Sequence, residues 1–376
     1  MRPAHGVHFI EQSLSPPTSD ELEYTHLSGF EPDSLPFVAG CCRSALYEVS
    51  VVLPVFNADQ SIELAVRSIL AQTFADFELI VVDDGSTDET VRVVSRISDS
   101  RLRLVQCPHR GVAAAANSAT EVARGPLIAR MDADDISHPR RLEEQHRLLR
   151  EQNLDVVGCQ VHILDPSGQE TESMRRYAHW INEETIDHDQ IVGLRFIELP
   201  LVNPTILARR SYFELGFRDD EFPEDYDLML RAAACGMAFG KVEQVLFEWA
   251  DRPDRLTRTD SRYSVSAFTR CRQAHLRVGP LHGIDQVDLW GVGQTGKPWL
   301  RWLQSQGVTV RHAYDVSKRK VGTQIHGVQV AHSDTLPDTD GTPLIIAVGA
   351  ASAREVILPQ IQSRGYVPGR DAWFVA

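Results

Sequence analysis

Closely spaced carboxylates are the residues of this 376-residue chain best suited to chemistry. Asp132 and Asp134 follow a short apolar run, and an Asp-x-Asp pair at a strand end can bridge a hard cation to a diphosphate. Mg²⁺ or Mn²⁺ in such a site offsets the charge that develops on a leaving phosphate. The spacing fits equally well an aspartate-rich turn that caps the next helix. This motif alone therefore leaves both interpretations open.

A second acidic pair, Asp83 and Asp84, follows another apolar run and precedes the polar residues 85–88. If the run is a strand, it delivers both acids to the edge of the sheet. One of them could there accept the N3–H of a uracil or a related base. The same segment suits a junction between strand and helix, with one of residues 86–88 as the N-cap. The two interpretations are compatible.

Glu224 and Asp225 form a third acidic pair, just before a stretch with helical spacing. One interpretation is a helix N-cap. The other is a general base, because sugar transfer with inversion needs a carboxylate opposite the leaving group to take the acceptor's proton. Such catalysis is worth typically 10²–10⁴-fold in rate.

The elements that position these acids alternate along the chain from residue 48, which predicts a parallel sheet with helices on both faces. Expected strands cover residues 48–53, 77–82, 102–106 and 126–131, and expected helices cover 62–70, 88–97 and 111–123. Such sheets bind ligands at the carboxyl ends of their strands. The first two acidic pairs both fall there.

The alternation weakens after residue 140. The pattern predicts helices at 141–152 and 225–235, strands at 156–163 and near 241–249, a loop-rich stretch at 165–190 and a helical stretch at 255–280. Gly279 and Pro280 then mark a boundary. We expect three parts: an irregular arm over 1–47, a main α/β domain over 48–283 and a small α/β domain over 284–376.

The small domain contains a glycine-rich turn. Gly291, Gly293 and Gly296 match GxGxxG between an expected strand at 287–291 and an expected helix at 297–306, and Asp315 follows about 20 residues later. The helix N-terminus would favour a phosphate. A nucleotide site is one interpretation of this turn, and a degenerate docking or regulatory domain is the other.

Composition narrows the classes of partner. The formal charge is 38 − 52 = −14, which disfavours nonspecific binding to nucleic acid or to anionic membranes. No apolar run is long enough for a spanning helix, and no secretory signal is visible. The six cysteines contain no CxxC pair, so we expect free thiols in a reducing cytoplasm. Peripheral contact with a membrane stays compatible with this composition.

The ordered set of motifs resembles family 2 glycosyltransferases, which have the GT-A nucleotide-diphospho-sugar transferase fold. The resemblance covers about residues 48–255 and rests on Leu53-Pro54-Val55-Phe56-Asn57, Val82-Asp83-Asp84-Gly85-Ser86-Thr87-Asp88, Ala129-Arg130-Met131-Asp132-Ala133-Asp134-Asp135, Asn203-Pro204-Thr205 and Glu224-Asp225-Tyr226-Asp227-Leu228. The C-terminal part resembles the small Rossmann-like domains that precede sugar-nucleotide acyltransferases.

The resemblance implies a role for each motif residue. Pro54 and Phe56 would line the base pocket, Asp84 with Asp83 would read the base, Arg130 would orient the donor, Asp132 would lie near the ribose or donor sugar, Asp134 would be the main contact of Mn²⁺ or Mg²⁺, Asp225 would be the catalytic base, and Glu224 would lie beside the acceptor. Trp249 with Arg252 or Arg255 matches a mobile segment over the diphosphate.

The implied reaction is inverting, metal-dependent transfer of a sugar from a nucleotide-diphosphate donor to a glycan, a lipid-linked molecule or another hydroxyl acceptor. One departure from the family pattern is His109-Arg110-Gly111, where Asn-x-Gly is usual. A sugar nucleotidyltransferase is disfavoured, because Pro54 and its neighbours replace the glycine-rich loop of that class. An inactive protein that senses a nucleotide through its C-terminal domain is the alternative from another class.

Overall fold

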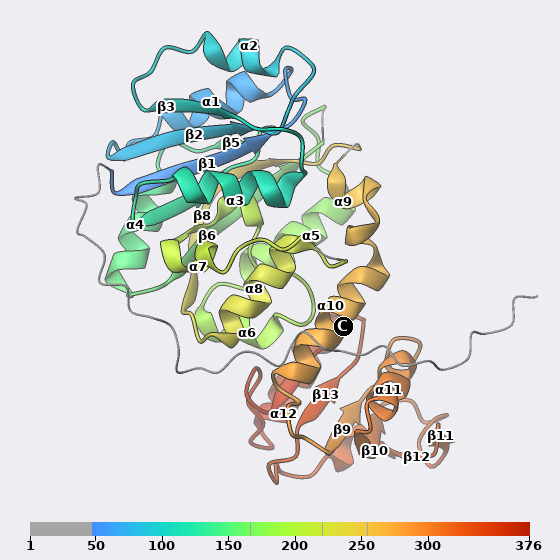
Figure 1. The fold of residues 1–376 in the computed structure, drawn as a ribbon. Helices are drawn as coiled ribbons and strands as arrows, with labels where there is room; N and C mark the ends of the chain where they lie inside the picture. Colours follow the sequence, from blue (N-terminus) through green and yellow to red (C-terminus); the bar gives the residue numbers. More distant parts are fainter. Residues whose placement is uncertain (1–46, 166, 220, 254) are drawn as a thin grey trace, which may run out of the picture. The chain divides into compact units, whose positions relative to one another are not determined.

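The computed structural model describes residues 47–376 apart from 166, 220 and 254. The arm predicted over residues 1–47 therefore lies outside the described residues, except for Tyr47. The described residues form two sheets, each combined with helices (Figure 1).

The first sheet has the strand order β3-β2-β1-β4-β7-β6-β8-β5. Its strands are β1 (Val49–Val55), β2 (Phe77–Asp83), β3 (Leu102–Gln106), β4 (Leu127–Arg130), β5 (Ile136–Ser137), β6 (Val156–Leu164), β7 (Leu207–Arg209) and β8 (Phe239–Ala250). Strands β1 to β4 pair in parallel, as does β6 with β8, whereas β7 is antiparallel to β4 and β6. The predicted GT-A-type, mostly parallel sheet is thus confirmed.

Helices cover both faces of the parallel strands because their residues alternate between two apolar surfaces. In β1, Val52 packs with the alanines of α3, whereas Val51 and Leu53 pack with the buried side of α1. Figure 1 shows α1 and α2 on one side of these strands and α3 on the other. The helices of this part are α1 (Ile62–Leu70), α2 (Thr90–Ser95), α3 (Val112–Val122), α4 (Arg141–Glu151), α5 (Glu172–Glu183), α6 (His188–Leu194), α7 (Arg210–Glu214), α8 (Glu224–Ala234), α9 (Leu256–Thr259) and α10 (Val265–Val278), with short 3₁₀ turns η1 (Asn203–Thr205) and η2 (Ser261–Tyr263).

The expectation that residues 165–190 are loop-rich is wrong. This stretch contains α5 and the start of α6. Thr171 and Asp187 are their N-caps, each accepting a hydrogen bond from the third backbone N–H of its helix. Helix α5 buries Trp180 and Ile181 against the first sheet. Most residues of α5 are polar, so the sequence pattern did not reveal its narrow apolar side.

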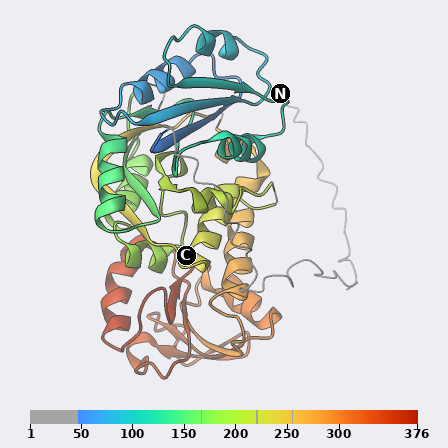
Figure 2. The same ribbon diagram turned by 60° about the vertical axis from the view of Figure 1, so that its left-hand side comes forward.

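The second sheet has the order β11-β12-β10-β9-β13-β14 and is parallel except for the β11–β12 hairpin. Its strands are β9 (Gln286–Trp290), β10 (Thr309–Asp315), β11 (Gln324–Ile325), β12 (Val328–His332), β13 (Leu344–Ile346) and β14 (Ala372–Phe374), with helices α11 (Gly296–Ser305) and α12 (Ala351–Gln362) and the turn η3 (Ser333–Thr335). These elements are coloured orange to red in Figure 2. The Rossmann-like C-terminal fold is confirmed, while the boundary at 283–284 stays a prediction.

Among the described residues, no helix combines the length and the apolar character needed to cross a membrane.

Candidate active site

The loop after β2 is folded onto the loop after β1. The Asp83 carboxylate accepts hydrogen bonds from the Ser86 N–H, and the Ser86 hydroxyl accepts from the Asn57 N–H at 2.9 Å. Asp88 accepts from the N–H of Thr90 at 2.9 Å, at the start of α2. The N-cap of α2 is Glu89, whose side chain makes no capping hydrogen bond, so the expectation that one of residues 86–88 is the N-cap is wrong.

Asp84 is held by the loop that precedes α3. Its two carboxylate oxygens accept from the backbone N–H groups of Arg110 and Gly111, each at 2.8 Å, and the His109 Nδ1 lies 2.9 Å from Oδ2. The side chain is 5% exposed. A carboxylate can accept about four hydrogen bonds, so one acceptor position is left for a ligand. The base-reading role of Asp84 stays a prediction.

An aromatic pair stands beside Asp84. The His109 ring stacks on the Phe56 ring with centroids 4.2 Å apart, and Phe56 is 45% exposed. An exposed, oriented phenyl ring at the carboxyl end of a sheet offers a stacking surface to a planar ligand. The sequence did not predict that His109 contacts Phe56 and Asp84. The one signal was its place in the unusual His-Arg-Gly tripeptide.

The Asp-x-Asp motif follows the end of β4. Arg130 is buried, and its Nη1 lies 2.8 Å from Oδ1 of Asp132, whose side chain is 32% exposed. Burial and the neighbouring charge of Asp132 raise the pKa of Asp134, while Arg255 and Arg252 oppose that rise. A cation near Asp134 would oppose this rise, because positive charge favours the ionised carboxylate.

Asp135 links this motif to β8. It is buried, and one of its oxygens accepts from the Ala250 N–H at 2.9 Å, while Oδ2 is buried without a hydrogen-bond partner. Beyond Ala250, the Arg255 guanidinium lies over the Trp249 ring, 4.4 Å from its centre. The segment suspected of covering the diphosphate is thus anchored next to the acidic motif.

The third acidic pair opens α8. The helix N-cap is Pro223, so neither acid takes the N-cap position, and that alternative is wrong. The hydroxyl of Tyr263 in η2 lies 2.7 and 2.6 Å from the two Glu224 oxygens. Burial, the charge of Glu224 and the more distant Asp132 raise the pKa of Asp225 to about 7.

The predicted site residues thus form two groups at one edge of the sheet. The charge of Asp132 raises the pKa of both Asp134 and Asp225, Glu224 also raises the pKa of Asp225, and Arg130 acts on Glu224. Pro54, Phe56, Asp83 and Asp84 form the second group around the ends of β1 and β2. Tyr263 was missed in the sequence, because it follows Asp225 by 38 residues and belongs to no motif.

Tyr263 yields a testable pH effect. In Tyr263→Phe, buried Glu224 loses its hydrogen bond and is expected to hold its proton to higher pH. Asp225 then no longer feels the negative charge of Glu224, so its pKa should fall and the acid limb of the pH–rate profile should move below its wild-type position. Tyr366→Phe is the matched control, because the Tyr366 hydroxyl is buried without a partner. An unchanged profile in Tyr263→Phe would contradict the coupling.

The glycine-rich turn joins β9 to α11. Gly291 has φ +96°, and a Cβ on Gly296 would lie 1.9 Å from the Gly291 carbonyl oxygen, so both positions require glycine. A Cβ on Gly293 would meet only the Lys320 Nζ, at 3.6 Å. Asp315 accepts from the Val292 N–H at 3.1 Å and from Lys320 at 2.8 Å. Asp315 and the turn are therefore adjacent, as predicted for a nucleotide site.

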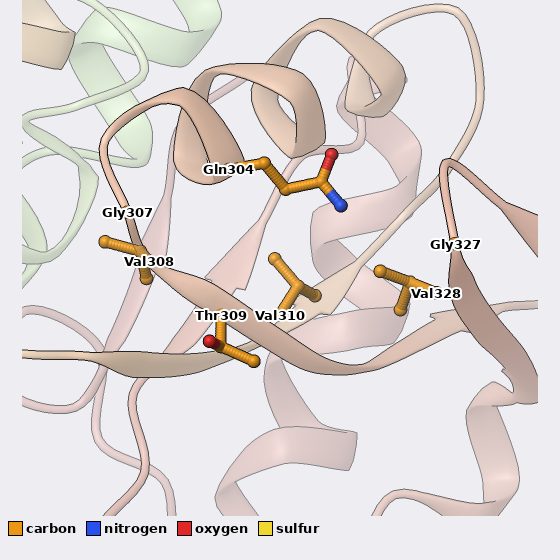
Figure 3. A pocket seen from close by; sticks show the side chains of 7 residues that line it. All are labelled: Gln304, Gly307, Val308, Thr309, Val310, Gly327 and Val328. Atoms are coloured by element: carbon orange, nitrogen blue, oxygen red, sulfur yellow. The ribbon is translucent and has the colours of Figure 1, made fainter.

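A cavity of about 360 Å³ in the same sheet lies elsewhere. Gln304, Val310 and Val328 point toward it, whereas Thr309 points away (Figure 3). Thr309 is level with the first residue of β9, and the glycine-rich turn follows the last. The cavity is thus at the opposite end of the strands from the predicted site.

Two parts of the chain match models of known protein families. Residues 50–217 fit the model of glycosyl transferase family 2. Over these residues the chain is similar to the family 2 glycosyltransferases. Residues 284–365 fit the family described as the CoA binding domain. The resemblance noted in the sequence is confirmed, and so is the assignment to the glycosyltransferases.

Relatives of this glycosyltransferase occur among bacterial proteins. The putative glycosyltransferase EpsE of Bacillus subtilis is 29% identical over 74% of this chain and 98% of its own. The Escherichia coli UDP-Glc:alpha-D-GlcNAc-diphosphoundecaprenol beta-1,3-glucosyltransferase WfgD is 39% identical over 32% of this chain, and the match spans about half of that relative (47%). The crystal structure of S. aureus TarS 1-349 in complex with UDP-GlcNAc has a TM-score of 0.50 at 19% identity, covering 62% of this chain and 68% of that one, and shows the shared fold.

Proposed function

We propose that this glycosyltransferase moves a sugar from a nucleotide-diphosphate donor to a hydroxyl acceptor with inversion at the anomeric carbon, and that Asp225 is the base. The supporting observation is the raised pKa of Asp225, about 7, at the start of α8. A carboxylate with that pKa is ionised above neutral pH and still basic enough to take a proton from an attacking hydroxyl. Glu224, held by Tyr263, would lie beside the acceptor.

The proposal includes a divalent cation, Mn²⁺ or Mg²⁺. Asp134, with Asp132, would hold it, and the buried Asp135 oxygen without a partner lies in the same motif. In the described part of the chain, no three His, Cys, Asp or Glu side chains form a metal-binding group by themselves. Carboxylates in such small number suit Mg²⁺ or Mn²⁺, which take further oxygens from substrate phosphates and water. When bound, the cation would stabilise charge on the leaving diphosphate.

The donor's base is expected on the exposed Phe56 ring, next to Asp84 and His109, with Pro54 and Asp83 behind it. Stacking of a base on an aromatic side chain is worth about 1–3 kcal/mol. We therefore expect Phe56→Ala to weaken donor binding by about 10-fold or more, as measured by calorimetry. Leu64→Ala is the control. Leu64 lies on α1 and is also an exposed apolar residue, and its loss should leave the affinity unchanged. Equal losses in both variants would exclude a specific role for Phe56.

Glycan or polysaccharide assembly is the proposed setting. The name of the E. coli relative, a glucosyltransferase acting on a diphosphoundecaprenol-linked sugar, supports a lipid-linked or glycan acceptor. A cytoplasmic location and peripheral contact with a membrane belong to the same proposal. Four described cysteines, Cys107, Cys159, Cys235 and Cys271, are free thiols, which is compatible with a reducing compartment.

The C-terminal domain supports a second, separate proposal, a nucleotide-bearing ligand at Gly291, Gly293, Gly296 and Asp315. The family match at residues 284–365 and the position of Lys320 beside Gly293 support it. A thermal-shift panel of nucleotide sugars with Mn²⁺ tests both sites together. A rise in melting temperature that Asp134→Ala abolishes belongs to the first site. A rise that survives in Asp134→Ala is assigned to the second. The absence of any rise would contradict both.

A further inference from the structure

A second cavity of about 340 Å³ lies where the two sheets' helices and strands meet. Arg195 and Phe196 after α6, Leu230 of α8 and Val278 of α10 form one wall, and Trp373 of β14 contributes the other side. This volume is within the range of small-molecule sites, about 300–1,000 Å³. It belongs neither to the acidic site nor to the glycine-rich turn.

The walls of this cavity are held together by polar contacts outside it. Arg272 of α10 donates to the carbonyl of Ile197 at 2.7 Å and to that of Val375 at 3.3 Å. Arg354 of α12 pairs with Glu184 at 3.1 Å. A Cβ on Gly193 would meet Pro368 at 3.2 Å, so α6 packs closely on the turn before β14. The cavity is therefore bounded by elements that are fixed to one another.

The cavity lining has hydrogen-bond donors and no acid. None of its ten lining residues is Asp or Glu, although the chain has a net charge of −14. The Arg195 guanidinium lies over the Phe196 ring, 4.7 Å from its centre, and donates to the Val192 carbonyl. Within the described residues, no carboxylate forms an ion pair with Arg195 at 4.0 Å or less. Burial lowers its pKa to about 10, as expected for a cation that lacks a counter-charge.

Trp373 provides a second, independent signal. Its side chain is 4% exposed, and its indole N–H is buried without an acceptor. A buried donor without a partner costs about 1–3 kcal/mol, and native structures seldom leave one unless a ligand or water satisfies it. His275, also in the lining, is already paired with Asp227 at 2.9 Å. Among the lining residues, Arg195 thus has no ion-pair partner and the Trp373 indole N–H has no acceptor.

From this arrangement we propose that the cavity binds a small organic anion, a phosphate or carboxylate on a compact apolar body. The anionic group would pair with the Arg195 guanidinium, and one oxygen would accept the Trp373 N–H. The apolar body would contact Phe196, Leu230 and Val278. A charged hydrogen bond of this kind is stronger than a neutral one, because the cation and the anion also attract each other.

The cavity is linked to the catalytic helix. The Tyr226 hydroxyl donates to the Arg195 carbonyl at 2.5 Å, and Tyr226 follows Asp225 in α8. The other end of α8 contributes Leu230 and Ala234 to the cavity. One helix therefore carries both the proposed base and part of the anion site.

The test uses the whole chain and two probes, phenyl phosphate and the neutral benzyl alcohol. The indole ¹⁵N–H signals of the six tryptophans are recorded by NMR, and Trp373→Phe identifies the Trp373 signal. We expect phenyl phosphate to shift the Trp373 signal saturably at up to millimolar concentration, and benzyl alcohol to leave it in place. No shift, an equal shift with benzyl alcohol, or a shift of the Trp249 signal alone would overturn the proposal.

Three variants sharpen the test. Arg195→Gln removes the cation and is expected to weaken the probe by about 10- to 100-fold, as loss of a charged hydrogen bond predicts. Ala234→Phe narrows the cavity at an exposed position and should also prevent binding without altering Arg195. Arg354→Gln breaks an ion pair outside the cavity, and this variant should still bind the probe. The other five indole signals report whether each variant is folded. Wild-type affinity in folded Arg195→Gln would contradict the proposal.

Discussion

Asp225→Asn is expected to lower the rate of sugar transfer by about 10²–10⁴-fold and to leave donor affinity near the wild-type value. Asparagine has the shape of aspartate but cannot take the proton of the acceptor hydroxyl. In the wild-type enzyme the rate should fall about tenfold per pH unit below the pKa of Asp225, which is about 7. Transfer rates and donor calorimetry on the same preparations check both parts.

Asp189→Asn is the control for this substitution. Asp189 is an exposed acid in the first turn of α6, a helix position like that of Asp225 in α8, and its loss should not alter the rate. Wild-type turnover in Asp225→Asn would refute the base assignment. A parallel loss of donor affinity would show instead that Asp225 contributes to donor binding.

Stability supplies a second readout for Asp225. Its pKa in the folded chain is about 7, above the usual value of 3.8, so the folded state holds this proton to higher pH than the unfolded state does. Its contribution to stability therefore falls as pH rises from about 4 to about 7. Asp225→Asn removes this cost, so at pH 8 the inactive variant should melt at a higher temperature than the wild type.

Asp134→Ala is expected to abolish the Mn²⁺-dependent part of donor binding. Cations of this kind contribute several kcal/mol, so a loss of about 100-fold in donor affinity, nearly 3 kcal/mol, is expected in the presence of Mn²⁺. Burial and Asp132 raise the pKa of Asp134, so its ionised form should be favoured by a bound cation. Calorimetric titration of a nucleotide sugar with and without Mn²⁺ measures the difference.

Two comparisons keep this result interpretable. Wild-type enzyme treated with a chelator should bind the donor as weakly as Asp134→Ala does, because both lack the same cation. Asp189→Asn should keep full dependence on Mn²⁺. Undiminished Mn²⁺ dependence in Asp134→Ala would place the cation on other residues.

Local sequence determined the framework of the first sheet. Apolar β-branched runs at β1 and β2 are buried on both faces, and small residues let α3 pack closely. Such runs leave few alternatives, because only strands with helices on both faces bury them completely. Helices α5 and α6 escaped prediction, because their caps and a few buried side chains outweigh an otherwise polar sequence.

By itself, the sequence determined the family and the identity of the acids, since ordered motifs of adjacent residues need no tertiary information. Only the tertiary structure decided which groups act on them. His109 meets Phe56 and Asp84, Tyr263 meets Glu224, and Arg195 shares a cavity with Trp373, which is 178 residues away (373 − 195). The physical reason is that pKa and hydrogen bonding depend on distance and burial in space, which residues far apart in the chain acquire only when the sheets and helices pack.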